Sequence, residues 1–241
     1  MRQACQIGAL ALLAMTGCRE RVPTPTPRAT AFGSAIVIVG GDKQAVSVGG
    51  RLDQPLVVQV NDAQGNGVAG VLVQLGASGD VLFDPPFGLT GGDGQFSAAA
   101  RLGGVSGWYH LVANTEDRSG HAHSVVFHER ALNYQQTLGL QLSEKHCVRC
   151  HDNESTAERV SNHDNLTVPP HALTDGGVLN PISDSNLVAV ISHGGPALGQ
   201  SAEMPPYTPT LSGADIDALV AYIRAVADPP YRPQGVFDAN R

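Results

Sequence analysis

Cys147-Val148-Arg149-Cys150-His151 is the stretch that decides how the 241-residue chain is organised, because apolar residues are spaced differently on its two sides. From Ala35 to about His128, apolar side chains recur at every second position in short runs between turns, which is typical of half-buried strands. From about Ala131 onward the apolar spacing is helical. We therefore predict a multidomain chain, with an all-β sandwich followed by an all-α domain. The alternating runs of the first part include Leu56, Val58 and Val60, then Trp108, His110 and Val112, then Val125 and Phe127.

The two cysteines of this stretch have the spacing of a c-type haem attachment site, Cys-x-x-Cys-His. Two thiols one helical turn apart can reach the two vinyl groups of a porphyrin, and the imidazole of the next residue then lies beneath the iron. The sequence predicts one covalent haem c, with thioethers at Cys147 and Cys150 and with His151 as the proximal ligand. A thioredoxin-like pair would need a βαβ context, and a structural zinc would need a second ligand pair, which His146 and His163 could supply. Export of the chain and the adjoining histidine favour haem.

Met204 is predicted to be the second axial ligand of the haem iron. The three methionines of the chain stand at positions 1, 15 and 204, and removal of an export signal leaves only the last. It lies in Glu203-Met204-Pro205-Pro206-Tyr207, where two prolines with restricted φ stiffen the loop that presents the thioether. His171 and His193 are rival ligands that would give bis-histidine coordination.

The second part of the chain has clear helix signals. Ser212 and Asp215 form a capping box before an apolar run of helical spacing, and Asp228-Pro229-Pro230 ends that run. Upstream, Ser183 can cap a helix that Gly194-Gly195 would stop. These signals predict an all-α haem domain.

Residues 132–227 resemble a class I-type monohaem cytochrome c domain through the haem motif, the Met-Pro-Pro loop and the terminal helix. The resemblance implies that Gly139 and Tyr222 lie where the first and last helices cross, and Leu142 stands there in place of a frequent aromatic. It also implies that a proline carbonyl, from Pro169 or Pro170, accepts the second N–H of the proximal histidine. With both axial positions filled the iron has no open site, which favours electron transfer over catalysis.

Residues 60–71, VNDAQGNGVAGV, and the turn at residues 91–95, GGDGQ, resemble motifs of the bacterial Ig-like repeats of adhesins and other surface proteins. Gly67 stands where that family usually has proline. The resemblance covers residues 34–130 and implies an Ig-like Greek-key sandwich, a fold that hosts unrelated roles. Four histidines of this segment are expected to be exposed or at strand edges and not to form a metal site: His110, His121, His123 and His128.

The first 17 residues indicate an export signal, because a short positive start precedes a brief apolar run that is too short to cross a bilayer. Met15-Thr16-Gly17-Cys18 resembles the lipobox of bacterial lipoproteins, which implies acylation of Cys18 after cleavage. Cys5 lies in the signal, so no cysteine is left for a disulfide. The predicted organisation is a signal peptide at 1–17, a Pro/Thr linker at 18–33, the Ig-like sandwich at 34–130, the cytochrome c domain at 131–229 and a tail at 230–241.

The formal net charge of −7 gives no basic footprint for nucleic acid and favours a basic redox partner protein. We expect an exported c-type cytochrome that transfers single electrons and is held to a membrane by its lipid, facing the periplasm or at the outer membrane. Two alternatives remain open at this point. One is a haem enzyme or ligand sensor in which Met204 dissociates, and the other is a surface-binding protein led by the Ig-like domain.

Overall fold

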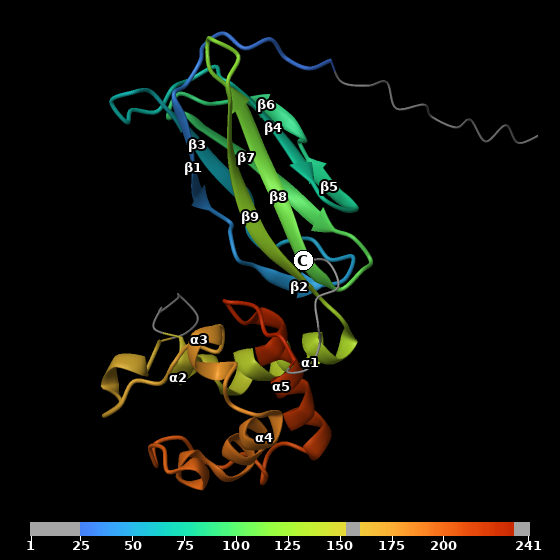
Figure 1. Cartoon of the computed structure of the whole chain (residues 1–241), viewed down its shortest axis with the longest axis vertical. Helices are drawn as coiled ribbons and strands as arrows, with labels where there is room; N and C mark the ends of the chain where they lie inside the picture. Colours follow the sequence, from blue (N-terminus) through green and yellow to red (C-terminus); the bar gives the residue numbers. More distant parts are fainter. Residues whose placement is uncertain (1–24, 153–159, 234–241) are drawn as a thin grey trace, which may run out of the picture.

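The structure is a computed structural model, and it describes residues 25–152 and 160–233. These residues form a β-sandwich and, after it, a helical domain (Figure 1). No helix of the described part is long and apolar enough to cross a membrane. The predicted export signal and the lipidation site at Cys18 lie outside the described residues.

Two sheets pack face to face in the sandwich. The four-stranded sheet has the order β1 (Ala35–Gly40), β3 (Leu56–Asn61), β7 (Gln95–Leu102) and β5 (Val81–Asp84). The five-stranded sheet has the order β2 (Ala45–Ser47), β9 (Ala122–Leu132), β8 (Gly107–Glu116), β4 (Leu72–Ala77) and β6 (Phe87–Leu89). The strand pairs are antiparallel except for β2, which runs parallel to β9. The all-β class predicted for this part is confirmed.

Alternation along the strands directs one face of each sheet into the core. β3 buries Leu56, Val58 and Val60, as its pattern predicts. β8 corrects the prediction: the alternation of Trp108, His110 and Val112 marks its outward face, and the buried residues are the intervening Tyr109, Leu111 and Ala113. Both faces of this strand carry apolar side chains, so periodicity alone does not determine which face is buried. The pairing of β8 with β4 and β9 determines it.

A close steric contact explains why position 67 is a glycine. A Cβ on Gly67 would lie 2.1 Å from the carbonyl oxygen of Asp93, because the turn before β4 packs directly against the turn before β7. A Cβ on Gly94, whose φ is +78°, would lie 2.5 Å from the Gly67 Cα atom. The two glycine turns from which the Ig-like resemblance was inferred therefore contact each other, and a proline at position 67 would not fit this contact.

The helical domain confirms the predicted all-α class. Its elements are α1 (Tyr134–His146), α2 (Val148–His151), η1 (His163–Asn165), α3 (Gly176–Leu179), α4 (Asp184–His193), η2 (Gly195–Leu198) and α5 (Gly213–Val226). The capping box of Ser212 and Asp215 begins α5, and the Ser183 side chain accepts a hydrogen bond from the Asn186 N–H at the start of α4. Gly194 adopts a φ of +82° at the end of α4, as its position predicts.

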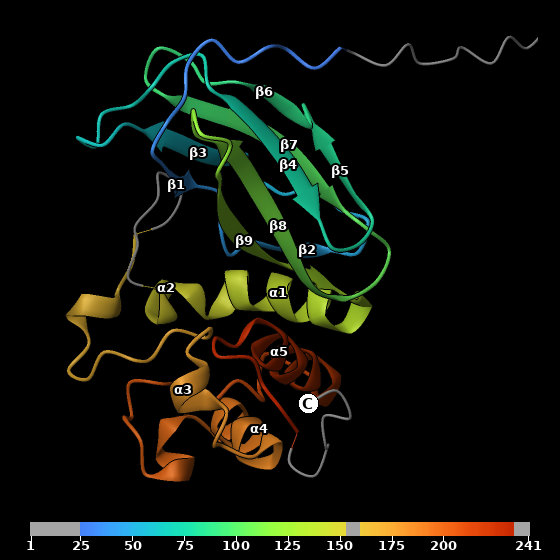
Figure 2. The same ribbon diagram turned by 45° about the horizontal axis from the view of Figure 1, so that its top comes forward.

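The sandwich and the helical domain join without a linker. Asn133 alone separates β9 from α1, where it is the N-cap, so the predicted boundary between residues 130 and 131 lies inside β9. Leu132 at the end of β9 is fully buried against Ala225 and Val226 of α5. Figure 2 shows α1 lying along the end of the sandwich near β2, and Lys43 Nζ adds an ion pair of 2.9 Å to Asp228. The buried apolar contact supplies most of the adhesion, since the ion pair is exposed.

Candidate haem-binding site

The predicted haem-attachment residues lie on a single turn that follows α1. Cys147 is the C-cap of α1, and its carbonyl oxygen accepts hydrogen bonds from the N–H groups of Cys150 and His151, both at 3.0 Å. Both thiols are free and half-buried. Burial raises the pKa of the Cys147 thiol to about 11. The turn therefore presents two thiols and one imidazole together, as the spacing of the motif requires.

A carbonyl oxygen orients the imidazole of His151. Nδ1 of His151 donates to the backbone oxygen of His171 at 2.8 Å, which leaves the lone pair of Nε2 free to ligate iron. Burial lowers the pKa of His151, which favours the neutral, ligating form. The proline prediction is wrong here: the acceptor is the residue that follows Pro169 and Pro170, and the Pro170 oxygen instead lies 3.2 Å from Nε2 of His163.

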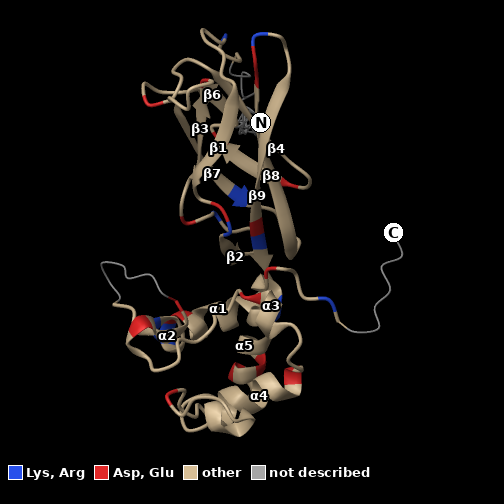
Figure 3. Ribbon diagram, turned by 60° about the vertical axis from the view of Figure 1, so that its left-hand side comes forward, with Lys and Arg blue, Asp and Glu red and all other residues tan. Residues whose placement is uncertain are grey.

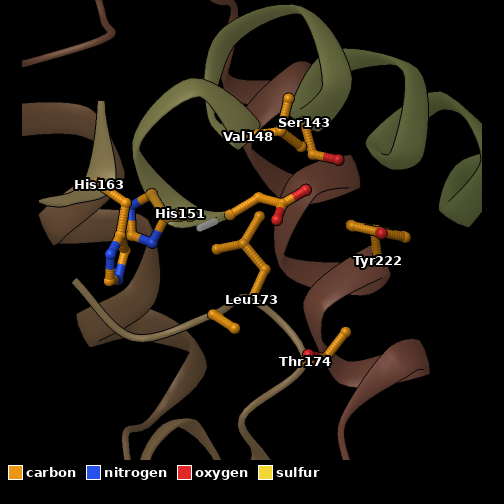
Figure 4. Close-up of a pocket in the computed structure, with 9 residues that line it drawn as sticks. Ser143, Val148, His151, His163, Leu173, Thr174 and Tyr222 are labelled. Carbon is orange, nitrogen blue, oxygen red and sulfur yellow. The ribbon is translucent and has the colours of Figure 1, made fainter. Parts of the chain in front are cut away.

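A cavity of about 420 Å³ lies beside the imidazole of His151. Figure 4 shows His151 and His163 next to each other on one side of it and Tyr222 on the other side, with Leu173 between. The complete lining is Ser143, Val148, His151, Asp152, His163, Ala172, Leu173, Thr174 and Tyr222. Its volume is in the range of cofactor sites, and the apolar residues within it would shield a porphyrin face.

The crossing of α1 and α5 forms the wall of this cavity. A Cβ on Gly139 would lie 2.0 Å from the carbonyl oxygen of Ala218 and 2.6 Å from Cβ of Tyr222, which confirms the crossing implied for Gly139 and Tyr222. Burial raises the pKa of Tyr222, and its hydroxyl shares a hydrogen bond with Ser143. Ser143, which is fully buried, also donates to the Leu140 oxygen at 2.8 Å. Sequence reasoning did not find Ser143, because a serine in a helix carries no signal of its own.

Met204 lies in a loop held against the end of α4. Its backbone oxygen accepts from the Gly195 N–H at 3.1 Å, and Tyr207 donates its N–H to the Ile191 oxygen at 3.1 Å. The side chain of Met204 is half-buried and packs on the apolar cluster that Cys147 also contacts, centred on Ile191 and Leu219. The hydroxyl of Tyr207 donates to the carbonyl oxygen of His146 at 2.9 Å, which ties this loop to the end of α1. The fold thus brings the loop of Met204 to the haem-attachment turn across 50 residues of sequence.

The rival histidines are directed elsewhere in the structure. His193 ends α4 with an exposed side chain, and the exposed ring of His171 places Nδ1 at 3.2 Å from a carboxylate oxygen of Asp175. His163 lines the cavity, but its Nδ1 lies 2.8 Å from Asp164 and its Nε2 faces the Pro170 oxygen. These contacts engage both ring nitrogens of His163.

The histidines of the sandwich form no metal site within the described residues, where no group of three His, Cys, Asp or Glu side chains is placed to hold an ion. The rings of His110 and His128 meet edge to face across two strands, with centroids 5.2 Å apart. His121 and His123 instead flank Asp117, whose Oδ2 lies 3.5 Å from Nε2 of His123.

The family model for subunit III of the cbb3-type cytochrome c oxidase matches residues 135–223, which lie within the helical domain. No curated protein matches the chain. The solved structures that are similar include the Escherichia coli adhesin FdeC, at 16% identity and a TM-score of 0.32, over 43% of this chain and 32% of that chain. The D0–D1 domain of intimin is 18% identical with a TM-score of 0.28, over 39% of this chain and 47% of that chain.

The chain spans about a third to a half of the length of these two structures. An Ig-like sandwich followed by a cytochrome c domain is the fold class that the strands, the helices and the family match define. A cytochrome c domain implies haem c as its cofactor and redox proteins as its partners. The residues of the turn fit this cofactor, because an imidazole oriented by a carbonyl and two free thiols lie on one turn. The cavity beside them is lined by His151, but not by Cys147, Cys150 or Met204.

Proposed function

We propose that this protein is an exported, lipid-anchored electron carrier with one covalent haem c, ligated by His151 and Met204. The observation that carries the proposal is the orientation of His151 by the His171 carbonyl, on the turn that also holds Cys147 and Cys150. When bound, the haem iron supplies one-electron redox chemistry. The protein supplies the tether, the proximal ligand and an apolar wall.

Each group of the site has a defined task under this proposal. Cys147 and Cys150 hold the cofactor by thioether bonds, which keeps it in place in an open extracytoplasmic compartment. The carbonyl of His171 fixes the plane and the tautomer of the His151 ring. Val148 and Leu173 supply apolar side chains to the lining of the cavity beside His151. Met204, on the loop next to α4, would supply the second protein ligand of the iron, and the iron would then have no open position for oxygen or peroxide.

The direct junction of the two domains supports a carrier role for the whole chain. Because Leu132 is buried against α5, the sandwich holds the haem domain at a fixed orientation, and the segment between Cys18 and the sandwich sets its distance from the membrane. Figure 3 shows acidic residues on several segments of the helical domain. Asp152 lines the cavity, and Asp164 contacts His163, which also lines it. We infer that the redox partner presents a basic surface.

Absorption spectroscopy of protein made with haem-attachment machinery tests the proposal. Wild type should show a low-spin c-type spectrum with a weak far-red band from sulfur–iron ligation, and Met204→Ala should lose that band and gain high-spin character. Cys147→Ser with Cys150→Ser should release the haem on denaturation. A wild type that is already high-spin, or a Met204→Ala spectrum that is unchanged, would show that Met204 is not the ligand and would favour a sensor, an enzyme or bis-histidine ligation.

A further inference from the structure

One segment orients the proposed ligand His151, and a separate segment carries the proposed ligand Met204. Residues 161–171 follow α2, and they carry the His171 carbonyl that orients His151. This segment is attached to the haem-attachment turn, since the Asn162 N–H donates to the Arg149 oxygen at 2.7 Å and the Ser161 hydroxyl donates to the Asp152 oxygen at 2.6 Å. Residues 201–207 carry Met204 and are attached to α4 and η2 instead.

Glu203, the residue before Met204, joins these two segments. Its carboxylate accepts the backbone N–H of Thr167 with Oε1 at 3.2 Å and with Oε2 at 3.1 Å, and Oε1 also accepts the Thr167 hydroxyl at 3.3 Å. The hydroxyl of Ser201 donates to Oε2 at 3.2 Å and itself accepts the N–H of Glu203 at 3.2 Å, so the carboxylate is held from its own side as well. An ionised acceptor that receives a backbone donor makes hydrogen bonds stronger than neutral ones.

We propose that Glu203 is a positioning residue that clamps the Met204 loop to the His151 segment through Thr167. The inference rests on the proposed His151 and Met204 ligation. Without the clamp, the hydrogen bonds that join the Met204 loop to other described segments lead to α4, η2 and the end of α1, and the loop can move away while the fold is kept. The expected consequence is a larger population in which Met204 has left the sixth position, with the His151 side unchanged.

Imidazole binding to the oxidised, haem-loaded full-length chain measures that population, because imidazole takes the sixth position only when Met204 leaves it. Glu203→Ala should bind imidazole roughly fivefold more tightly than wild type, and Thr167→Val, which removes only the hydroxyl donor, roughly twofold. The double variant should bind imidazole as tightly as Glu203→Ala does, since both substitutions break the same contact between Glu203 and Thr167. Glu203→Gln should fall between wild type and Glu203→Ala, because its amide oxygen still accepts one hydrogen bond.

Glu116→Ala is the matched control, since it removes the same charge from an exposed site at the end of β8. Amide hydrogen exchange at Thr167 should be faster in Glu203→Ala and unchanged in Glu116→Ala, at equal denaturation midpoints. Equal imidazole affinity in Glu203→Ala and wild type, or additive effects of Glu203→Ala and Thr167→Val, would overturn the clamp. A Met204→Ala spectrum identical to wild type would instead overturn the ligation on which it rests.

Discussion

Replacing Gly139 by alanine should force α1 and α5 apart at the wall of the cavity beside His151. The added Cβ would lie 2.0 Å from the Ala218 carbonyl oxygen and 2.6 Å from Cβ of Tyr222, whereas real Cβ atoms essentially never come within 3.0 Å of another atom. The helices must therefore separate by about 1 Å at the crossing, and overpacking of this kind costs about 1–3 kcal/mol. The better helix propensity of alanine offsets roughly 1 kcal/mol of that cost. We expect a net loss of up to about 2 kcal/mol in the free energy of unfolding.

Gly213→Ala is the control for this substitution. Gly213 opens α5, and a Cβ there would meet nothing within 4 Å, so the same chemical change should be neutral or stabilise by about 0.5 kcal/mol. Guanidinium unfolding of the haem-loaded chain, followed by helix ellipticity and by haem absorbance, measures both variants. Gly139→Ala should lower the midpoint of both signals. A Gly139→Ala midpoint raised as much as that of Gly213→Ala would refute the close crossing of α1 and α5.

Two further predictions concern the sandwich and its junction with the helical domain, and both can be followed by the fluorescence of the single tryptophan, Trp108, in β8. Burial raises the pKa of Glu129 from its ordinary 4.5 to about 8, so the folded state retains a proton that the unfolded chain releases. The contribution of Glu129 to sandwich stability should therefore be fully present below about pH 4.5, and stability should fall by up to about 1.4 kcal/mol per pH unit until about pH 8. Glu129→Gln should abolish this slope. If the variant keeps the slope, another group causes it. Leu132→Ala should cost about 2–5 kcal/mol and shift the tryptophan and helix signals together, because Leu132 contacts both domains; a shift of one signal alone would contradict this coupling.

Much of the fold could be predicted from local patterns. Alternation identified the strands of the sandwich, and the caps at Ser183 and Ser212 identified two helices, because a hydrogen bond within four residues depends on little else. The short segment α3 was not predicted, since a four-residue helix has no periodicity to detect.

The site was predictable where its parts are covalent neighbours. Cys147, Cys150 and His151 share one turn, so their spacing alone determines that they meet, whatever surrounds them. Met204 packs on the apolar cluster that Cys147 also contacts, which includes Ile191 and Leu219. This contact depends on how α4 packs against α5, and no local sequence pattern contains that information.

The sequence by itself determined that strands precede helices, that two thiols and an imidazole share one turn, and that Met204 is the one methionine after Met15. Only the tertiary structure decided which face of β8 is buried, which carbonyl orients His151, and that Glu203 bonds to Thr167. The reason is physical: the first set depends on groups a few residues apart, whose geometry the backbone fixes. The second set depends on contacts between distant segments, which form only after the helices and sheets have packed.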